Sequence, residues 1–256
     1  MIPRVVPPLT GATVLVTRPL PQAQALAEQI IARGGEAIVF PTIAIEPAAA
    51  SAPEPHDWVI FVSVHAVEHG AALISHWQST RIAAIGKATA SALAAAKLTV
   101  DVIPDAPFTS EALLAHPGFQ PTAGQRVLIV RGSGGRDTLR ETLTARDVHV
   151  GMLDVYRRVR PNVAPDQIAA LETRWSEEGI DAVTATSFET YANLIELLTP
   201  RGRELLARTP LLAPTQRIID AARESGWDSQ ALVTGSAEDA ALVGTLARWR
   251  ARARDR

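Results

Sequence analysis

An internal repeat at a constant offset constrains the fold of this chain more than any other feature. The segment TVLVTRPLPQAQALAEQIIARGGEAIVFPTIAI, beginning at Thr13, aligns without a gap with RVLIVRGSGGRDTLRETLTARDVHVGMLDVYRR, beginning at Arg126. The alignment places Arg18 on Arg131. Because repeated supersecondary units are the signature of an architecture built from similar parts, the repeat predicts two related lobes.

A second pair of related segments supports this division. DWVIFVSVHAVEHG, beginning at Asp57, matches DAVTATSFETYANL, beginning at Asp181. Each segment is predicted to form a short strand that ends at a serine, Ser63 or Ser187, and to continue into a helix.

Along the whole chain, short β-branched runs alternate with longer segments of helical spacing, which predicts an α/β fold with mostly parallel strands flanked by helices. The runs predicted as strands are Val14–Thr17, Ala37–Phe40, Trp58–Phe61, Ile82–Ile85, Val100–Ile103, Val127–Val130, Val148–Tyr156, Ala182–Ala185, Leu211–Ala213 and Leu232–Thr234. The predicted helices include Pro21–Arg33, Asp137–Ala145, Pro165–Glu177, Phe188–Leu198 and Ala237–Arg254.

Composition excludes several classes of protein. The chain has no cysteine, which excludes disulfides, thiolate catalysis and cysteine-ligated metals. Its net charge of −2 argues against a nucleic-acid partner. The sequence shows neither a signal peptide nor an uninterrupted apolar run of about 18 residues, so we expect a cytoplasmic protein without a membrane partner. No long apolar stripe is left unassigned, so we expect a monomer.

Polar residues follow the predicted strands at the edge where parallel α/β sheets bind ligands. These junctions are Thr17-Arg18-Pro19, Ser63, the loop Arg131-Gly132-Ser133-Gly134-Gly135-Arg136, and Ser187. Helix N-termini and glycine-rich turns attract anions there, so two lobes that present such edges to each other predict a cleft for a polyanion. The alternatives are that the serines are only N-caps and that the glycine loop is only a flexible turn.

A histidine motif raises the alternative of a zinc hydrolase. Residues 65–69 read HAVEH and match H-x-x-E-H, which sets His65 and His69 on one helix face with Glu68 between them. The match falls in the first helical turn after a predicted strand, and the sequence marks no carboxylate as a third ligand. Short motifs without their structural context are mostly chance, so we expect no metal.

Taken in order, several segments resemble the uroporphyrinogen-III synthase family over almost the whole chain. They are LVTRP, PTIAIEP, DWVIFVSVHAVE, IAAIGKATASAL, VLIVRGSGGRDTLRETL, DVYRRVRP and the DAVTATS junction. The resemblance implies two similar lobes with parallel sheets flanked by helices, joined by a two-stranded β ladder. Residues 1–40 and 160–256 would form a discontinuous first lobe, residues 46–153 the second, and residues 41–47 with 153–159 the ladder.

The activity implied by the resemblance is the closure of a linear tetrapyrrole, hydroxymethylbilane, to uroporphyrinogen III with inversion of ring D, without cofactor or metal. The substrate carries four acetate and four propionate groups, which require a site for carboxylates. Arg18 and Arg131, together with Gly132 and Ser133 of the glycine loop, suit that requirement. A second hypothesis is a catalytically inactive two-lobe module that binds an anionic small molecule.

The family's motifs also carry individual residues onto this sequence. Its tyrosine on the second ladder strand matches Tyr156, which would assist departure of the hydroxyl as a proton donor. The threonine of its G-x-x-T turn matches Thr89, for which a helix cap is the alternative interpretation. Its two junction serines match Ser63 and Ser187, although the customary FTS reads FVS here. The corresponding threonine of the other lobe matches Thr215 across a short insertion.

Overall fold

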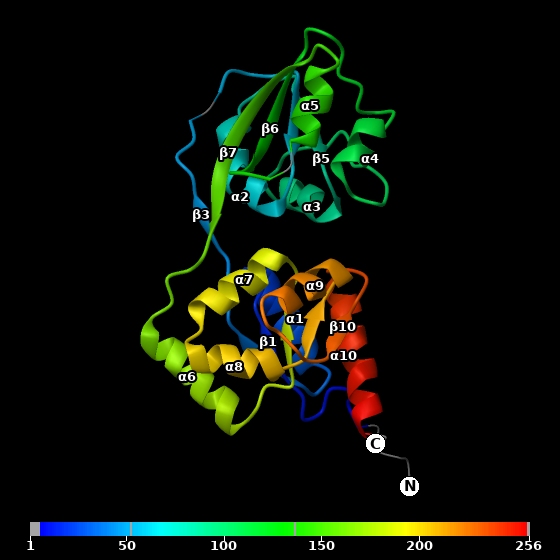
Figure 1. The fold of residues 1–256 in the computed structure, drawn as a ribbon. Coiled ribbons are helices and arrows are strands. Elements are labelled where there is room, and N and C mark those ends of the chain that lie inside the picture. Colours follow the sequence, from blue (N-terminus) through cyan, green and yellow to red (C-terminus); the bar gives the residue numbers. More distant parts are fainter. Residues whose placement is uncertain (1–5, 52, 136, 255–256) are drawn as a thin grey trace. The chain divides into compact units, whose positions relative to one another are not determined.

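The computed structural model of the protein describes residues 6–51, 53–135 and 137–254. The chain divides into two compact units: a first unit of Met1–Ala44 with Val159–Arg256, and a second unit of Ile45–Arg158. Figure 1 shows that helices flank the strands in each unit. The α/β fold with parallel sheets, predicted from the alternation of strands and helices, is confirmed.

The sheet of the first unit has the strand order β10-β9-β8-β1-β2, and its four neighbouring pairs run parallel. The strands are β1 (Thr13–Val16), β2 (Glu36–Val39), β8 (Ala182–Thr184), β9 (Leu211–Ala213) and β10 (Ala231–Val233). Short runs of buried apolar residues form the central strands, as expected for a parallel sheet that is covered on both faces.

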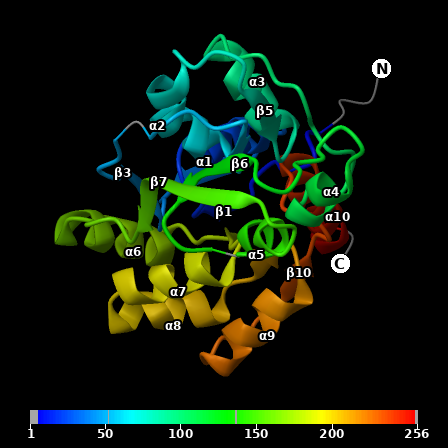
Figure 2. The same cartoon turned by 90° about the horizontal axis from the view of Figure 1, so that it is seen from above.

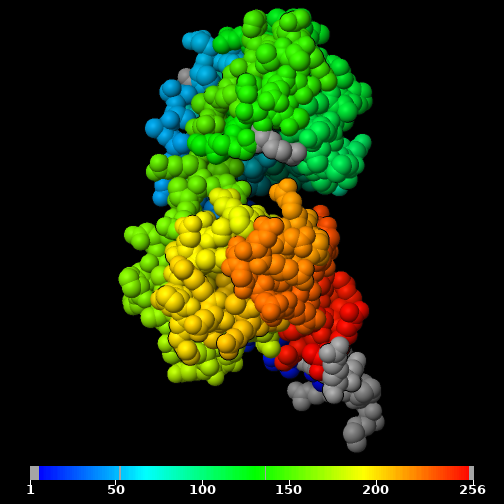
Figure 3. Space-filling view, in the orientation of Figure 1, coloured from blue at the N-terminus to red at the C-terminus, as the bar shows by residue number. Residues whose placement is uncertain are grey.

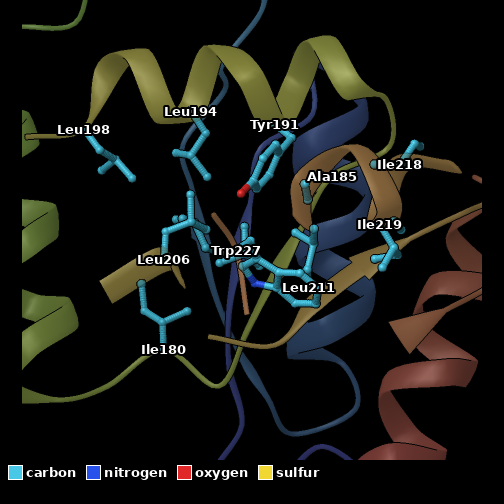
Figure 4. Packing of buried hydrophobic residues seen from close by; sticks show 14 of the residues in the cluster. Ile180, Ala185, Tyr191, Leu194, Leu198, Leu206, Leu211, Ile218, Ile219 and Trp227 are labelled. Atoms are coloured by element: carbon cyan, nitrogen blue, oxygen red, sulfur yellow. The ribbon is translucent and has the colours of Figure 1, made fainter. Parts of the chain in front are cut away.

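Two layers of helices cover this sheet. One layer contains α1 (Gln22–Ile31) and α10 (Asp239–Arg254). The other contains α6 (Pro165–Glu177), α7 (Phe188–Leu197), α8 (Pro200–Arg208) and α9 (Gln216–Glu224). Figure 4 shows Tyr191, Leu194 and Trp227 pointing into the core beneath this second layer. The outer surfaces of α7, α8 and α9, yellow to orange in Figure 3, adjoin one another on the visible face of the first unit.

The sheet of the second unit has the strand order β3-β7-β6-β4-β5. The strands are β3 (Ala44–Pro47), β4 (Trp58–Phe61), β5 (Arg81–Ala84), β6 (Arg126–Gly132) and β7 (His149–Val159). The pairs β5–β4, β4–β6 and β6–β7 are parallel. The carboxyl ends of β4, β5, β6 and β7 therefore lie at one edge of this sheet.

The side chains of β4 alternate between two cores. Val59 and Phe61 pack with α2 (Val64–Ile74) and α3 (Lys87–Ala95), whereas Trp58 and Ile60 pack with α4 (Ser110–Ala115) and α5 (Thr138–Thr144). Figure 2 shows α2 and α3 on one side of β6 and β7 and α5 on the other. The period of two residues in a strand thus distributes one short apolar run over both faces of the sheet.

The two copies of the repeat lie in different units. The copy that begins at Thr13 forms β1, α1 and β2 of the first unit, and the copy that begins at Arg126 forms β6, α5 and β7 of the second. In chain order within their units, β1 and β2 come first and second, whereas β6 and β7 follow β4 and β5, and β6 pairs with β4. Related segments therefore occupy different positions in two sheets of similar strand order.

One of the predicted strands is absent from the structure. The prediction of a strand at residues 100–103 was wrong, since only Val102 makes an isolated bridge, to Ala83. Pro104 follows directly and cannot donate a backbone hydrogen bond, which limits pairing at this outer edge of the sheet. Residues 44–47, which the family resemblance places in a ladder with residues 153–159, form β3 beside β7. Within the described residues, no helix is long and apolar enough to cross a membrane.

Candidate functional site

Three neighbouring strands of the second unit bring predicted site residues to one edge of its sheet. Ser63 follows β4, Gly132 ends β6, and Tyr156 lies on β7 directly opposite Gly132 in the strand register. A register shift between Arg131 and Gly132 interrupts the ladder at this point. Irregularities of this kind re-aim side chains at the ends of strands.

Tyr156 is held on several sides. Its ring is almost entirely buried, with 8% of the residue exposed. Its hydroxyl lies 3.1 Å from Ser63 Oγ, and its carbonyl oxygen accepts a 2.8 Å hydrogen bond from the Ser133 N–H. A Cβ at residue 132 would lie 2.5 Å from Tyr156 Cε2 and Cζ, so only glycine admits the ring in this position. Gly132, predicted as part of a substrate-binding loop, therefore has a packing role.

Ser63 serves both as an N-cap and as a partner of Tyr156. Its backbone is extended, and its Oγ accepts a 3.1 Å hydrogen bond from the Ala66 N–H at the start of α2. The N-cap interpretation of Ser63 is therefore confirmed. The cap also fixes the hydroxyl in a position from which it contacts the phenol.

The two histidines of the HAVEH motif flank Tyr156. The centroids of the His65 and His69 rings lie 5.7 Å and 6.2 Å from that of Tyr156. Glu68 Oε2 lies 2.8 Å from His65 Nδ1. Among the described residues, no group of three or more histidine, aspartate and glutamate side chains is arranged to hold a metal ion. The arrangement thus gives the zinc-hydrolase alternative no support.

Arg131 is buried and already paired with carboxylates. Its Nη1 lies 3.3 Å from Asp137 Oδ1, its Nε lies 3.4 Å from Asp154 Oδ1, and the same Nε donates to the Gly132 carbonyl oxygen at 3.0 Å. The hydrogen bond from Arg140, followed by that from Arg131, lowers the pKa of Asp137. This network fixes the guanidinium at the start of the glycine loop. Arg136, which ends the loop, lies outside the described residues.

Arg18 has an equivalent partner in the first unit. It forms an ion pair through Nη1 with Asp239 at the start of α10, and the other oxygen of Asp239 accepts a 3.2 Å hydrogen bond from Gln29. The side chains of Arg18 and Asp239 are 15% and 22% exposed. Each of the two arginines that the repeat aligns is therefore bound to a carboxylate within its own unit.

The remaining predicted residues of the first unit also stand at strand-to-helix junctions. Ser187 caps α7, accepting a 3.1 Å hydrogen bond from the Thr190 N–H, so its N-cap interpretation is confirmed as well. Thr215 is the exposed N-cap residue of α9, and its side chain makes no capping hydrogen bond. The exposed Thr215 hydroxyl is therefore accessible to a ligand at the carboxyl edge of the first unit's sheet.

Thr89, in contrast, lies inside a helix of the second unit. The N-cap of α3 is Gly86, and Thr89 is a buried residue of the first turn. The interpretation of Thr89 as a helix cap was wrong, because the chain enters α3 at Gly86, three residues earlier. Thr89 lies in the first turn of the helix that follows β5. Because β5 runs parallel to β4, its carboxyl end lies at the same edge of the sheet as Ser63.

Sequence reasoning missed the partners of these residues. Asp239 and Asp154 were not among the predicted site residues, and His65 was considered only as a metal ligand. Asp239 lies 221 positions from Arg18 in the sequence, so no local pattern connects them. The motif spacing did indicate that His65 and His69 share a helix face, and this face contacts Tyr156.

Comparison with known proteins gives a consistent result. The family model described as Uroporphyrinogen-III synthase HemD matches residues 24–242. The chain is 34% identical over 245 residues to the uroporphyrinogen-III synthase of Salmonella typhimurium (strain LT2), covering 90% of this chain and 98% of that protein. It is 31% identical to the enzyme of Escherichia coli (strain K12) with the same coverage, and 32% identical to that of Synechococcus elongatus over 75% of this chain and 76% of that one.

Two solved structures share the fold. A mutant uroporphyrinogen III synthase from the extremely thermophilic bacterium Thermus thermophilus matches with a TM-score of 0.55 at 21% identity, covering 96% of this chain and all of that one. The uroporphyrinogen-III synthetase from Helicobacter pylori 26695 matches with a TM-score of 0.56 at 14% identity, covering 89% and 95% of the two chains. At these identities the likeness concerns the fold alone.

Proposed function

Because the chain belongs to the uroporphyrinogen-III synthase family, we propose that it cyclises hydroxymethylbilane to uroporphyrinogen III, releasing water and inverting ring D. The observation that carries this function is the 34% identity to the Salmonella typhimurium enzyme over 98% of its length. The protein is accordingly an enzyme of the lyase class that acts in tetrapyrrole biosynthesis.

The chemistry begins with departure of the terminal hydroxyl, which needs a proton to leave as water. Loss of water gives a cationic azafulvene, the substituted carbon of ring D attacks it, and the resulting spiro intermediate fragments and recloses with ring D inverted. The proton required at the start is regained when the new pyrrole ring loses its hydrogen, so the reaction consumes no acid. One well-placed donor is therefore sufficient.

Tyr156 is the residue proposed as this donor. Ser63 Oγ accepts the Ala66 N–H and lies 3.1 Å from Tyr156 Oη. When Ser63 donates its own hydrogen to Tyr156 Oη, the phenolic hydrogen remains available for the leaving hydroxyl. The close approach of the ring to Gly132 holds the phenol in one orientation while it does so.

The carboxylates of the substrate are proposed to bind at the carboxyl edges of both sheets. In the first unit the groups are Arg18, Ser187 and Thr215. In the second unit they are Ser63, Thr89, Arg131, Gly132 and Ser133. Since Arg18 and Arg131 already hold carboxylates, their remaining N–H groups, together with helix N-terminal N–H groups, would receive those of the substrate.

Three further properties are part of this proposal. Residues 41–47 and 153–159, which carry the chain between the two units, would form the connecting ladder between two similar lobes. The enzyme would act as a monomer in the cytoplasm. Light scattering of the purified protein tests the oligomeric state, and a mass of twice the 27.3 kDa chain would contradict it.

The decisive experiment is to incubate the purified protein with hydroxymethylbilane and to separate the type I and type III isomers of the product. We expect the III isomer in excess at early times. Formation of the I isomer alone, at the rate seen without protein, would reject the synthase and leave the inactive anion-binding module. The Tyr156→Phe variant tests the donor, because we expect it to slow ring closure more than it changes the free energy of unfolding. Turnover equal to wild type would reject Tyr156 as the donor.

A further inference from the structure

The histidine pair of the HAVEH motif has no part in the function proposed above, yet it contacts the proposed proton donor. His65 and His69 lie one helical turn apart on α2, and both rings pack near Tyr156. The His65 and Tyr156 rings form a T-shaped pair, with an interplanar angle of 66° and a centroid distance of 5.7 Å. The side chain of His65 is 12% exposed. The partly buried histidine thus forms part of the surroundings of Tyr156.

We propose that His65 is a positioning residue for Tyr156 and that Glu68 holds His65 in this role. The inference rests on the proposed function, because it assigns a partner to the donor of that reaction. It also gives the HAVEH motif a purpose that needs no metal.

The contact between Glu68 and His65 fixes the imidazole. A carboxylate can only accept hydrogen bonds, so the 2.8 Å contact between Glu68 Oε2 and His65 Nδ1 keeps a proton on Nδ1 and sets the ring orientation. The side chain of Glu68 is 46% exposed. The carboxylate therefore orients the partly buried imidazole from the solvent side.

The T-shaped contact suits a phenol that has to be held in one orientation. The rim of an aromatic ring is electropositive and its face is electronegative, so a T-shaped pair is attractive in one relative orientation of the two rings. The imidazole therefore restricts the orientation of the phenol ring. Ser63 fixes the hydroxyl end of the same side chain, so the two contacts together restrict both ends of the phenol.

The helix that carries His65 is itself held closely against the sheet. A Cβ at Gly70 would lie 2.6 Å from Val130 Cγ1 and 3.3 Å from Val155 Cγ1, so glycine allows α2 to approach β6 and β7. Val155 adjoins Tyr156 in the chain. The imidazole is therefore presented to the phenol from a rigid element, which is what precise positioning requires.

The test is a double-mutant cycle with His65→Gln and Tyr156→Phe, measured as the initial rate of III-isomer formation. We expect His65→Gln to lower kcat about three- to tenfold, the range for a lost aromatic pair, with KM unchanged and Tm lowered by only about a few degrees. In the Tyr156→Phe background the same substitution should have no further effect. The matched control is His76→Gln, which replaces an exposed histidine just beyond the end of the same helix and should behave as wild type.

A second measurement does not depend on activity. The chain contains two tyrosines, Tyr156 and Tyr191, so NMR of tyrosine-labelled protein resolves them separately. We expect His65→Gln to shift the ring signals of Tyr156 and to leave those of Tyr191 in place. Glu68→Gln, on the surface, should shift them in the same direction by less and lower kcat about two- to threefold, consistent with the loss of one charge-assisted hydrogen bond at an exposed site. This variant replaces His65→Gln if the latter does not fold.

The outcomes separate this inference from the function. Absence of the III isomer with wild-type protein would overturn the proposed function. Normal III-isomer formation together with an unchanged kcat in His65→Gln would overturn the role of His65 alone. Equal rate losses in the wild-type and Tyr156→Phe backgrounds, or unshifted Tyr156 signals, would also overturn it.

Discussion

The ring of Tyr156 lies directly against the backbone of Gly132, where a Cβ would come within 2.5 Å of Cε2 and Cζ of the phenol. The Gly132→Ala variant must therefore displace the ring or the strand. We expect a loss of about 1–3 kcal/mol in the free energy of unfolding, which is typical of overpacking. We also expect at least about a tenfold loss of kcat, because the Tyr156 hydroxyl would move away from Ser63 Oγ. Urea unfolding and the III-isomer assay measure the two effects.

Gly244 in α10 provides the control for this substitution. A Cβ there would lie 3.4 Å from the flexible end of Arg248, which is ordinary contact. Gly244→Ala should leave activity unchanged and stabilise the helix by about 0.5–1 kcal/mol. If Gly132→Ala were equally harmless, the packing role of Gly132 would be wrong.

Ser63 has two contacts whose loss can be measured separately. Ser63→Ala removes the cap of α2 and the hydroxyl beside Tyr156. Thr109→Ala removes only a cap, since Thr109 Oγ1 accepts the Ala112 N–H of α4 at 3.2 Å. We expect both variants to lose about 1 kcal/mol of stability, but only Ser63→Ala to lose kcat. Similar kcat values in the two variants would show that Ser63 does not act through Tyr156.

The predictable part of the fold is the part determined by neighbours in the sequence. The run Trp58–Phe61 predicts a buried strand because four apolar residues precede a capping serine, and the structure has the strand at those residues. Ser63 and Ser187 were predicted as possible N-caps for the same local reason, since a cap depends on the next three residues. The repeat likewise predicted which segments are related.

The partners within the site depend on tertiary structure and could not be predicted. Arg18 was expected to be available for substrate, but its carboxylate partner Asp239 is brought to it by the packing of α1 on α10. The approach of Tyr156 to Gly132 depends on a register shift in the pairing of β6 with β7, which no sequence pattern marks. Local rules place each residue at the correct edge, whereas the pairs formed there follow from how elements pack.

The ion pair between Arg18 and Asp239 makes the proposed role of Arg18 testable. Arg18→Met removes the guanidinium, whereas Asp239→Asn removes only its partner. If Arg18 binds a substrate carboxylate, Arg18→Met should raise KM about tenfold or more, the effect of losing one charge-assisted hydrogen bond. Asp239→Asn should cost about 1 kcal/mol of stability without raising KM. Identical KM values in both variants would limit Arg18 to a structural role.

The burial of His56 predicts how the free energy of unfolding depends on pH. Its ring stacks on Trp77 at 5.8 Å, and burial lowers the pKa of His56 below its usual value of 6.5, against the opposing hydrogen bond of Nδ1 with the Glu54 carbonyl oxygen. As the pH falls through about 6.5, His56 therefore binds a proton in the unfolded chain before it does so in the folded protein. Stability rises with pH wherever the unfolded state holds more protons than the folded state. The contribution of neutral His56 to the free energy of unfolding is therefore complete above the unfolded pKa of 6.5 and is lost as the pH falls toward the folded pKa.

We therefore expect the free energy of unfolding of the wild type to fall between about pH 7 and pH 5, and to fall less steeply in His56→Gln. Urea titrations at several pH values measure the two slopes. His76→Gln removes an exposed histidine and should follow the slope of the wild type. Equal slopes in the wild type and His56→Gln would contradict the assignment, because a histidine kept neutral by burial has to contribute a proton difference over this range.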